Sequence, residues 1–161
     1  KALKWLVANE YIHIEKYRTS KTKKSKYPVL MEKALAYLHI NNVPGKGSFE
    51  HALYQHLIFE KITKDGYTAK IEGRMKNSKK LIDVWGVPPD RKLVVAFEIT
   101  LSFNNLRANI VSDFNAGVSE VVIVCRTKED MNKAQGIVTS AGFSEHINDR
   151  IKCETIDVYF S

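Results

Sequence analysis

Two short apolar stretches, each carrying one carboxylate, constrain the fold of this chain more than any other feature. They are Leu81–Trp85 (Leu-Ile-Asp-Val-Trp) and Leu93–Thr100 (Leu-Val-Val-Ala-Phe-Glu-Ile-Thr). Both are rich in β-branched and aliphatic residues without a helical period, so we expect a β-strand in each. The first contains Asp83 and the second Glu98. Burying an unpartnered carboxylate costs roughly several kcal/mol, so we expect each to have a partner, a metal ion or a function.

The connection between these strands is short and is built on Pro88-Pro89-Asp90-Arg91. It suits an antiparallel hairpin, which brings Asp83 and Glu98 close together if both side chains point to the same face of the sheet. Two convergent carboxylates can bind a hard divalent cation such as Mg²⁺ or Mn²⁺, which assists phosphodiester chemistry. The two strands therefore predict a candidate metal site.

The remaining elements predict an α/β fold. From residue 49 onward we expect helices at 49–64, 104–116 and 128–140, and further strands at 67–75, 121–125 and 155–160. Their order is α-β-β-β-α-β followed by α-β. The apolar run 121–125 is typical of a strand covered on both faces, and the crossover that leads to it predicts a mixed central sheet.

A basic segment marks the N-terminal part of the chain. We expect a helix at 2–12, strands at 13–17 and 27–31, and a helix at 32–40, with a polar turn at 18–26 that has no acidic residue. The candidate nucleic-acid-binding residues are Lys16, Arg18, Lys21, Lys23, Lys24 and Lys26. Such a concentration of like charge, in a chain of net charge +7, favours contact with DNA phosphates. The alternative is a solvated hairpin tip.

The segment 2–40 resembles the recognition helix, wing and following helix of winged helix–turn–helix DNA-binding proteins. Tyr27-Pro-Val-Leu-Met-Glu-Lys33 stands where such proteins close the wing, although Ala34 replaces the usual glycine. The resemblance implies that DNA is a partner, and that the first helices of the motif lie before residue 1. We therefore expect a partial winged helix at 1–42, a linker at 43–48 and a second domain at 49–161.

The second domain resembles the PD-(D/E)xK superfamily of restriction-endonuclease-like nucleases. Glu50 matches the helix glutamate of that family, which helps to hold metal or water. Asp83 matches its principal Mg²⁺ ligand, and Glu98 matches the acidic residue of its E-x-K element. The Gly47–His51 stretch and the strands around Asp83 and Glu98 are also similar to C-terminal domains of conjugative or mobile-element ATPases. This similarity implies a larger parent chain or an ATPase partner.

One departure from the family pattern bears on catalysis. Thr100 stands where the family has a lysine two residues after the glutamate, and threonine cannot supply that positive charge. Lys80 is the nearest substitute. It precedes Asp83 by three residues, so a regular strand would point it to the opposite face, and a bulge at Lys79-Lys80 would be needed to redirect it.

Three functions follow from these patterns. The first is a DNA-binding module with a retained carboxylate cluster and weak or absent cleavage. The second is an active Mg²⁺-dependent endonuclease that uses Glu50, Asp83, Glu98 and Lys80. The third is a protein-interaction domain of a larger ATPase. Whether the chain is an enzyme, and whether it forms a homo-oligomer, stays open.

Simpler interpretations stand beside each site residue. Glu50 suits the first turn of a helix on electrostatic grounds alone, and Asp83 and Glu98 could pair with lysines such as Lys80 or Lys92. Cys125 and Cys153 match no zinc spacing. No apolar run approaches the ~20 residues that span a bilayer, so we expect no membrane segment and a cytoplasmic protein.

Overall fold

The computed structural model of the chain describes residue 8 and residues 12–18, 24–30, 49–75, 80–90, 92–143 and 149–160. The chain divides into two compact units, Lys1–Ala52 and Leu53–Ser161. Each unit is described by itself.

The first unit contains an antiparallel hairpin. Strand β1 (Ile12–Arg18) pairs with strand β2 (Lys24–Leu30), and its register sets Lys16 opposite Lys26 and Arg18 opposite Lys24. The prediction of two strands around a basic turn is confirmed, with β2 starting three residues earlier than expected. The predicted helix at 32–40, the linker at 43–48, and Lys21 and Lys23 lie outside the described residues, as does the predicted helix at 2–12 apart from the helical Ala8.

The second unit is an α/β domain built on a five-stranded sheet of order β3-β4-β5-β6-β7. Strands β3, β4 and β5 are antiparallel, whereas β5, β6 and β7 are parallel, so the sheet is mixed, as predicted. The elements are α3 (Phe49–Lys64), β3 (Thr68–Arg74), β4 (Leu81–Val87), β5 (Val95–Thr100), α4 (Leu106–Asn115), β6 (Glu120–Cys125), α5 (Lys128–Ser140), β7 (Ile151–Thr155) and the 3₁₀ helix η1 (Ile156–Tyr159).

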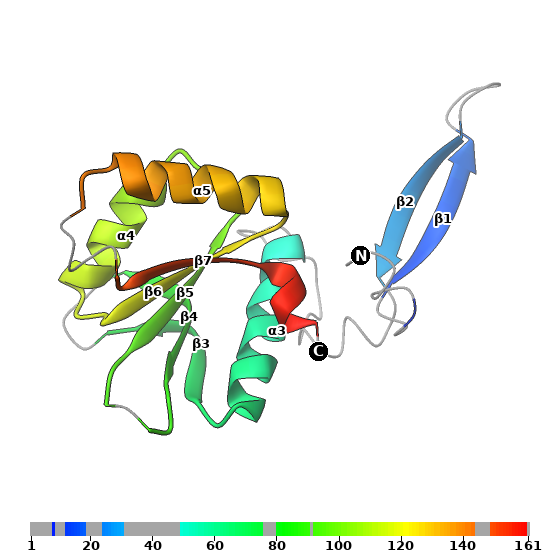
Figure 1. The fold of residues 1–161 in the computed structure, drawn as a ribbon. Coiled ribbons are helices and arrows are strands. Elements are labelled where there is room, and N and C mark those ends of the chain that lie inside the picture. Colours follow the sequence, from blue (N-terminus) through cyan, green and yellow to red (C-terminus); the bar gives the residue numbers. More distant parts are fainter. Residues whose placement is uncertain are drawn as a thin grey trace. The chain divides into compact units, whose positions relative to one another are not determined.

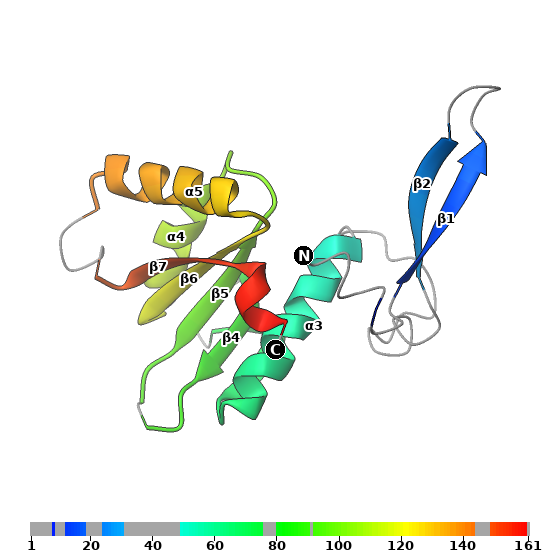
Figure 2. The same ribbon diagram turned by 45° about the vertical axis from the view of Figure 1, so that its right-hand side comes forward.

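Helices cover both faces of this sheet (Figures 1 and 2). Helices α4 and α5 lie on one face and α3 on the other. Every residue of β5 is buried, as are the last five of β6, because both strands are central and covered on both sides. Burial of this kind explains why β6 reads as an unbroken apolar run. It also makes the polar residues of β5, Glu98 and Thr100, exceptional.

The last predicted strand, at 155–160, is wrong. Strand β7 instead covers Ile151–Thr155, where it pairs in parallel with β6 from Val121 onward. The chain then turns into η1, in which Ile156 and Tyr159 are three residues apart and both buried. A 3₁₀ helix has three residues per turn, so this spacing places both side chains against the core. The apolar residues at the end of the chain therefore reflect a helical turn rather than an alternating strand.

None of the helices in the described residues is both long enough and apolar enough to cross a membrane.

Candidate functional site

Asp83 and Glu98 lie beside each other on neighbouring central strands. Strands β4 and β5 pair at Gly86 with Val95, Trp85 with Ala96, and Val84 with Phe97, and the pairing ends there. Asp83 lies two residues from Trp85 and Glu98 two residues from its partner Ala96, and residues two apart on a strand share a face of the sheet. The charge of Asp83 also contributes to a raised pKa of Glu98. The prediction that the two carboxylates converge is confirmed.

The strand pairing changes character at Asp83. Beyond Val84, the backbone N–H of Ile99 donates to Asp83 Oδ2 at 2.9 Å, so a side chain continues the contact between the strands. On the other edge of β4, the pairs Ile71–Val84 and Gly73–Ile82 flank Glu72, whose φ of +48° is left-handed. The carboxylate of Asp83 therefore sits where the regular ladder is interrupted on both sides of β4.

Helix α3 reaches this point through Gln55. The buried Gln55 side chain donates through Nε2 to the main-chain oxygen of Asp83, at 3.5 Å. Gln55 thus joins α3 to the strand that carries the first candidate ligand.

Lys80 enters the same site from outside the strand. Its Nζ lies 3.3 Å from Glu98 Oε1, and it donates to Asp113 Oδ1 and, at 3.1 Å, to the main-chain oxygen of Asn109. The expectation that Lys80 would point to the opposite face applied to a regular strand, but Lys80 precedes the first residue of β4 and lies outside its alternation. The flexible four-carbon side chain of Lys80 lets its ammonium reach Glu98 and Asp113.

Asp113 is the site residue that the sequence interpretation missed. It lies in α4, its side chain is fully buried, and it shares the buried stripe of that helix with Leu106 and Ile110. A signal was present: positions 106, 110 and 113 follow helical spacing, so an aspartate stood where an apolar residue belongs. A charged residue on the core face of a helix needs a partner, which is Lys80.

Burial dominates the electrostatics of this cluster, which we define as Lys80, Asp83, Glu98 and Asp113. Burial, followed by the charges of Asp113 and Asp83, raises the pKa of Glu98 to about 8, against the opposing effect of the Lys80 ammonium. Burial also raises the pKa of Asp113, which the hydrogen bond from Lys80 partly counteracts. Three carboxyl groups and one ammonium thus influence one another, and the low-dielectric interior disfavours full ionisation of the carboxyl groups.

Two oxygens of the cluster have unused hydrogen-bonding capacity. Glu98 Oε1 and Asp113 Oδ2 are buried and have no hydrogen-bond partner, although Lys80 Nζ forms an ion pair with the former. Carboxylate oxygens are hard donors of the kind that Mg²⁺ and Mn²⁺ prefer. Across the described residues, no three His, Cys, Asp or Glu side chains are arranged to hold a metal ion. In the observed arrangement the cation among the carboxylates is Lys80.

The other predicted site residues lie elsewhere. Thr100 is buried two residues beyond Glu98 on β5 and brings no charge to the cluster. Glu50 lies in the first turn of α3, in the unit that ends at Ala52, and its position relative to Asp83 is not defined. Lys16, Arg18, Lys24 and Lys26 are on the hairpin of the first unit.

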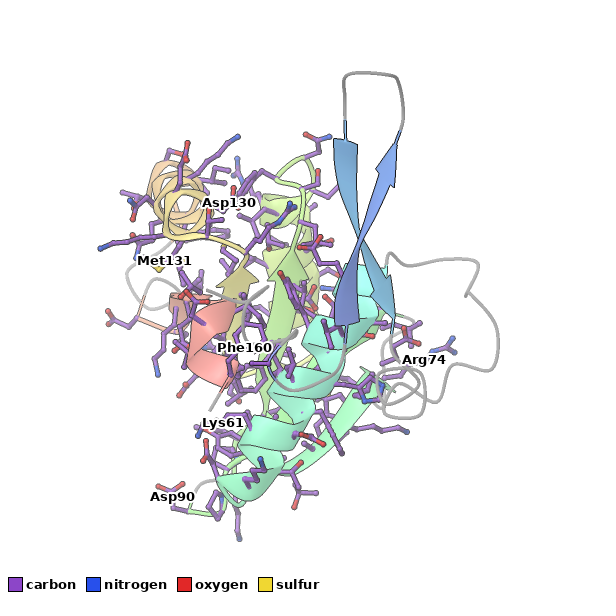
Figure 3. The ribbon with its side chains drawn as sticks, turned by 90° about the vertical axis from the view of Figure 1, so that its right-hand side faces the viewer. Lys61, Arg74, Asp90, Asp130, Met131 and Phe160 are labelled. Atoms are coloured by element: carbon purple, nitrogen blue, oxygen red, sulfur yellow. The ribbon has the colours of Figure 1, made fainter. Side chains whose placement is uncertain are left out.

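A separate hollow lies on the other face of the sheet. It has a volume of about 210 Å³ and its lining includes Tyr67, Phe97 and Tyr159. Lys61, which is labelled in Figure 3, reaches it from α3. Phe97 is adjacent to Glu98 in β5, and neighbouring strand residues point to opposite faces, so this hollow is not part of the cluster.

Both cysteines are free. Burial raises the pKa of Cys125 to about 12 and that of Cys153 to about 11, so both thiols are protonated at neutral pH and neither is a ready nucleophile.

Comparisons of the chain with known protein families, with curated proteins and with solved structures found no match. The fold and the cluster define an α/β protein with a mixed five-stranded sheet and a buried lysine–carboxylate site.

Proposed function

We propose that the chain is a DNA-binding module whose second unit has a restriction-endonuclease-like fold and a carboxylate cluster with weak or absent cleavage activity. The single observation that carries DNA binding is the register of the hairpin, which sets Lys16 opposite Lys26 and Arg18 opposite Lys24. The support for a nuclease-like site is the adjacency of Asp83 and Glu98 on β4 and β5.

The hairpin argument is electrostatic. Like charges at directly opposed positions of a β-ladder destabilise it, so two basic pairs close together cost stability in isolation. Phosphate groups remove that repulsion, and binding them releases counterions. A basic hairpin of this register is therefore best explained by an anionic partner, and phosphate contacts of this kind position a protein on DNA without reading its sequence.

The weakness of cleavage follows from the residues at the site. Thr100 supplies no positive charge, and removal of one preorganised group that stabilises developing charge costs about 10²–10³ in rate. The cluster also holds its own ammonium, which balances part of the carboxylate charge in the absence of metal.

DNA binding is tested by fluorescence anisotropy with a labelled duplex over a series of salt concentrations. The hairpin variant replaces Lys16, Arg18, Lys24 and Lys26 with glutamine. We expect weaker binding and a salt slope smaller by about three to four, since each lost phosphate contact removes about one counterion. The matched control removes the same number of charges from exposed positions of the second unit, Lys64, Lys70, Lys92 and Lys128.

Three outcomes separate the possibilities. An unchanged salt slope in the hairpin variant removes the hairpin from the interface. If the control variant loses as much DNA affinity as the hairpin variant, binding depends on net charge alone. If the intact chain binds no DNA at low salt, the proposal fails and a protein-interaction domain takes its place.

A second candidate function is Mg²⁺-dependent DNA cleavage, and one observation favours it. Lys80 Nζ lies 3.3 Å from Glu98 Oε1, so a cationic group stands next to the second candidate ligand without the missing E-x-K lysine. In that case Asp83 and Glu98 would hold the ion, which would polarise the phosphodiester, and Lys80 would stabilise developing negative charge. Supercoiled and branched DNA incubated with Mg²⁺ or Mn²⁺ tests it. If no cleavage appears, or if Asp83→Asn leaves cleavage unchanged, this second function is rejected.

A further inference from the structure

The cluster combines carboxyl groups from three separate elements with one ammonium. Asp83 comes from β4, Glu98 from β5 and Asp113 from α4, and Lys80 precedes β4. The ammonium contacts Glu98 and Asp113 directly. Since the helix and the strands are held by the core of the domain, the carboxylates are fixed by the fold, whereas Lys80 is placed by its own flexible stem.

Two buried carboxylate oxygens of the cluster lack a hydrogen bond. The Lys80 ammonium donates to Asp113 Oδ1 and to the Asn109 carbonyl. Glu98 Oε1 and Asp113 Oδ2 remain buried without a hydrogen bond. Asp113 is fully buried and Glu98 is 6 % exposed, so bulk water does not satisfy these oxygens. Buried acceptors in this state favour a cation that takes more oxygen ligands than an ammonium can.

We propose that Lys80 is a built-in cation that competes with a divalent metal ion for a site formed by Glu98, Asp113 and Asp83. An oxygen-preferring ion such as Mn²⁺ takes six or more ligands and carries twice the charge of the ammonium. Binding of the ion drives Lys80 away from Glu98 and Asp113. The Lys80 side chain is already 17 % exposed, so its path to solvent is short.

This inference also explains why no metal-holding trio is seen among the described residues. The Lys80 ammonium contacts Glu98 and Asp113 directly, so these two carboxylates are arranged around nitrogen rather than around a metal ion. Asp113 is the new member of the site. The inference rests on the metal-binding part of the proposed function and is independent of DNA binding.

The first test measures Mn²⁺ affinity by isothermal titration calorimetry and by the loss of the free Mn²⁺ electron paramagnetic resonance signal. Lys80→Met keeps the stem and removes the charge, so we expect Mn²⁺ to bind at least about tenfold more tightly than in the wild type. Adding Asp113→Asn to Lys80→Met should remove most of that gain. The control is Lys152→Met, which breaks an exposed ion pair with Glu120 outside the cluster.

A second measurement uses the wild-type chain, in case Lys80→Met does not fold. Reductive methylation followed by mass spectrometry reports the reactivity of each lysine. We expect Lys80 to be protected without metal and to react several-fold faster in saturating Mn²⁺, while Lys152 is unchanged. The inference is overturned if Mn²⁺ binds and leaves Lys80 protected, or if neither the wild type nor Lys80→Met binds Mn²⁺ at millimolar concentration. It also fails if Asp113→Asn has no effect on affinity.

The anisotropy measurement on the same proteins keeps the two proposals apart. Lys152→Met, which lies outside both the hairpin and the cluster, should bind duplex DNA and Mn²⁺ as the wild type does. If the hairpin variant loses DNA binding but keeps the competition between Mn²⁺ and Lys80, both proposals are supported. If DNA binding does not depend on the hairpin, the proposed function fails; if Mn²⁺ does not compete with Lys80, the inference about the cluster fails.

Discussion

The backbone N–H of Ile99 donates to Asp83 Oδ2 at 2.9 Å, so one carboxylate oxygen of β4 holds the neighbouring strand β5 in place. Ile99 directly follows Glu98, the other candidate ligand. This bond fixes the spacing of the two carboxylates, because it joins the side chain of Asp83 to the main chain of Ile99, the residue next to Glu98. Asp83 is therefore a structural residue as well as a candidate metal ligand, and variants at this position must separate the two roles.

Asp83→Ala should destabilise the domain more than Asp83→Asn. Alanine leaves the N–H of Ile99 without its acceptor, which costs about 1–3 kcal/mol for a buried group. Asparagine retains an acceptor oxygen and removes the charge, so its cost should be smaller. Urea unfolding followed by circular dichroism measures both. Equal destabilisation by the two variants would show that the charge, and not the hydrogen bond, holds the strands.

The stability of the domain should depend on pH through Glu98. Its pKa is raised from 4.5 to about 8 in the folded state, so the fold binds this proton more tightly than the unfolded chain does. The resulting stabilisation is complete below pH 4.5, declines as pH rises, and is lost above about pH 8. Its size is roughly a few kcal/mol, at ~1.4 kcal/mol per pKa unit.

Glu98→Gln isolates this effect because glutamine mimics the protonated side chain and does not titrate. In metal-free buffer, the difference in unfolding free energy between Glu98→Gln and the wild type should grow between about pH 5 and about pH 8. A difference that is constant over this range would show that Glu98 is ionised throughout in the folded protein.

The sequence predicted the parts of this fold that depend on local patterns. Helix α3 was predicted with the bounds that are observed, because its apolar spacing and its ends are both marked by residue type. The mixed sheet followed from one short connection and one crossover. The final strand was misplaced because alternation and a 3₁₀ turn are hard to distinguish over a short stretch, and only the packing of Ile156 and Tyr159 decides between them.

The candidate site was predicted only in part, for a physical reason. Asp83 and Glu98 converge because the β4–β5 register is local. Lys80 and Asp113 are 33 residues apart, and their contact depends on how α4 packs against the sheet. A long flexible side chain just outside a strand is not limited by strand periodicity, so its direction could not be read from spacing. Asp113 was detectable as a charge in an apolar stripe, but its partner was not.

Lys80 and Asp113 should be strongly coupled in stability. Breaking a buried ion pair by changing one partner leaves an uncompensated charge and costs about 3–5 kcal/mol, whereas apolar replacement of both partners is often much less costly. We expect Lys80→Met and Asp113→Leu each to destabilise the domain more than the double variant does. A double-mutant cycle from urea unfolding measures the coupling. Additive effects would show that the two side chains do not interact in solution, and would also remove the basis for metal competition.

Gly73 and Gly136 should respond to alanine in opposite directions. A Cβ at Gly73 would lie 1.5 Å from Nε1 of Trp85, so the indole of β4 must move for any side chain to fit on β3. Overpacking of this kind costs typically about 1–3 kcal/mol. A Cβ at Gly136, in helix α5, meets nothing within 4 Å, and alanine there should stabilise the helix by about 0.5–1 kcal/mol.

Trp85 reports the first of these changes directly. The chain has two tryptophans, so a Trp5→Phe background leaves Trp85 as the fluorophore. In that background Gly73→Ala should shift the emission of Trp85 to longer wavelength as the ring is displaced toward water, and Gly136→Ala should leave it unchanged. Because β3 and β4 flank the interrupted pairing at Asp83, displacement of Trp85 should also weaken Mn²⁺ binding in Lys80→Met. An unshifted emission in Gly73→Ala would mean that the ring does not cover Gly73 in solution.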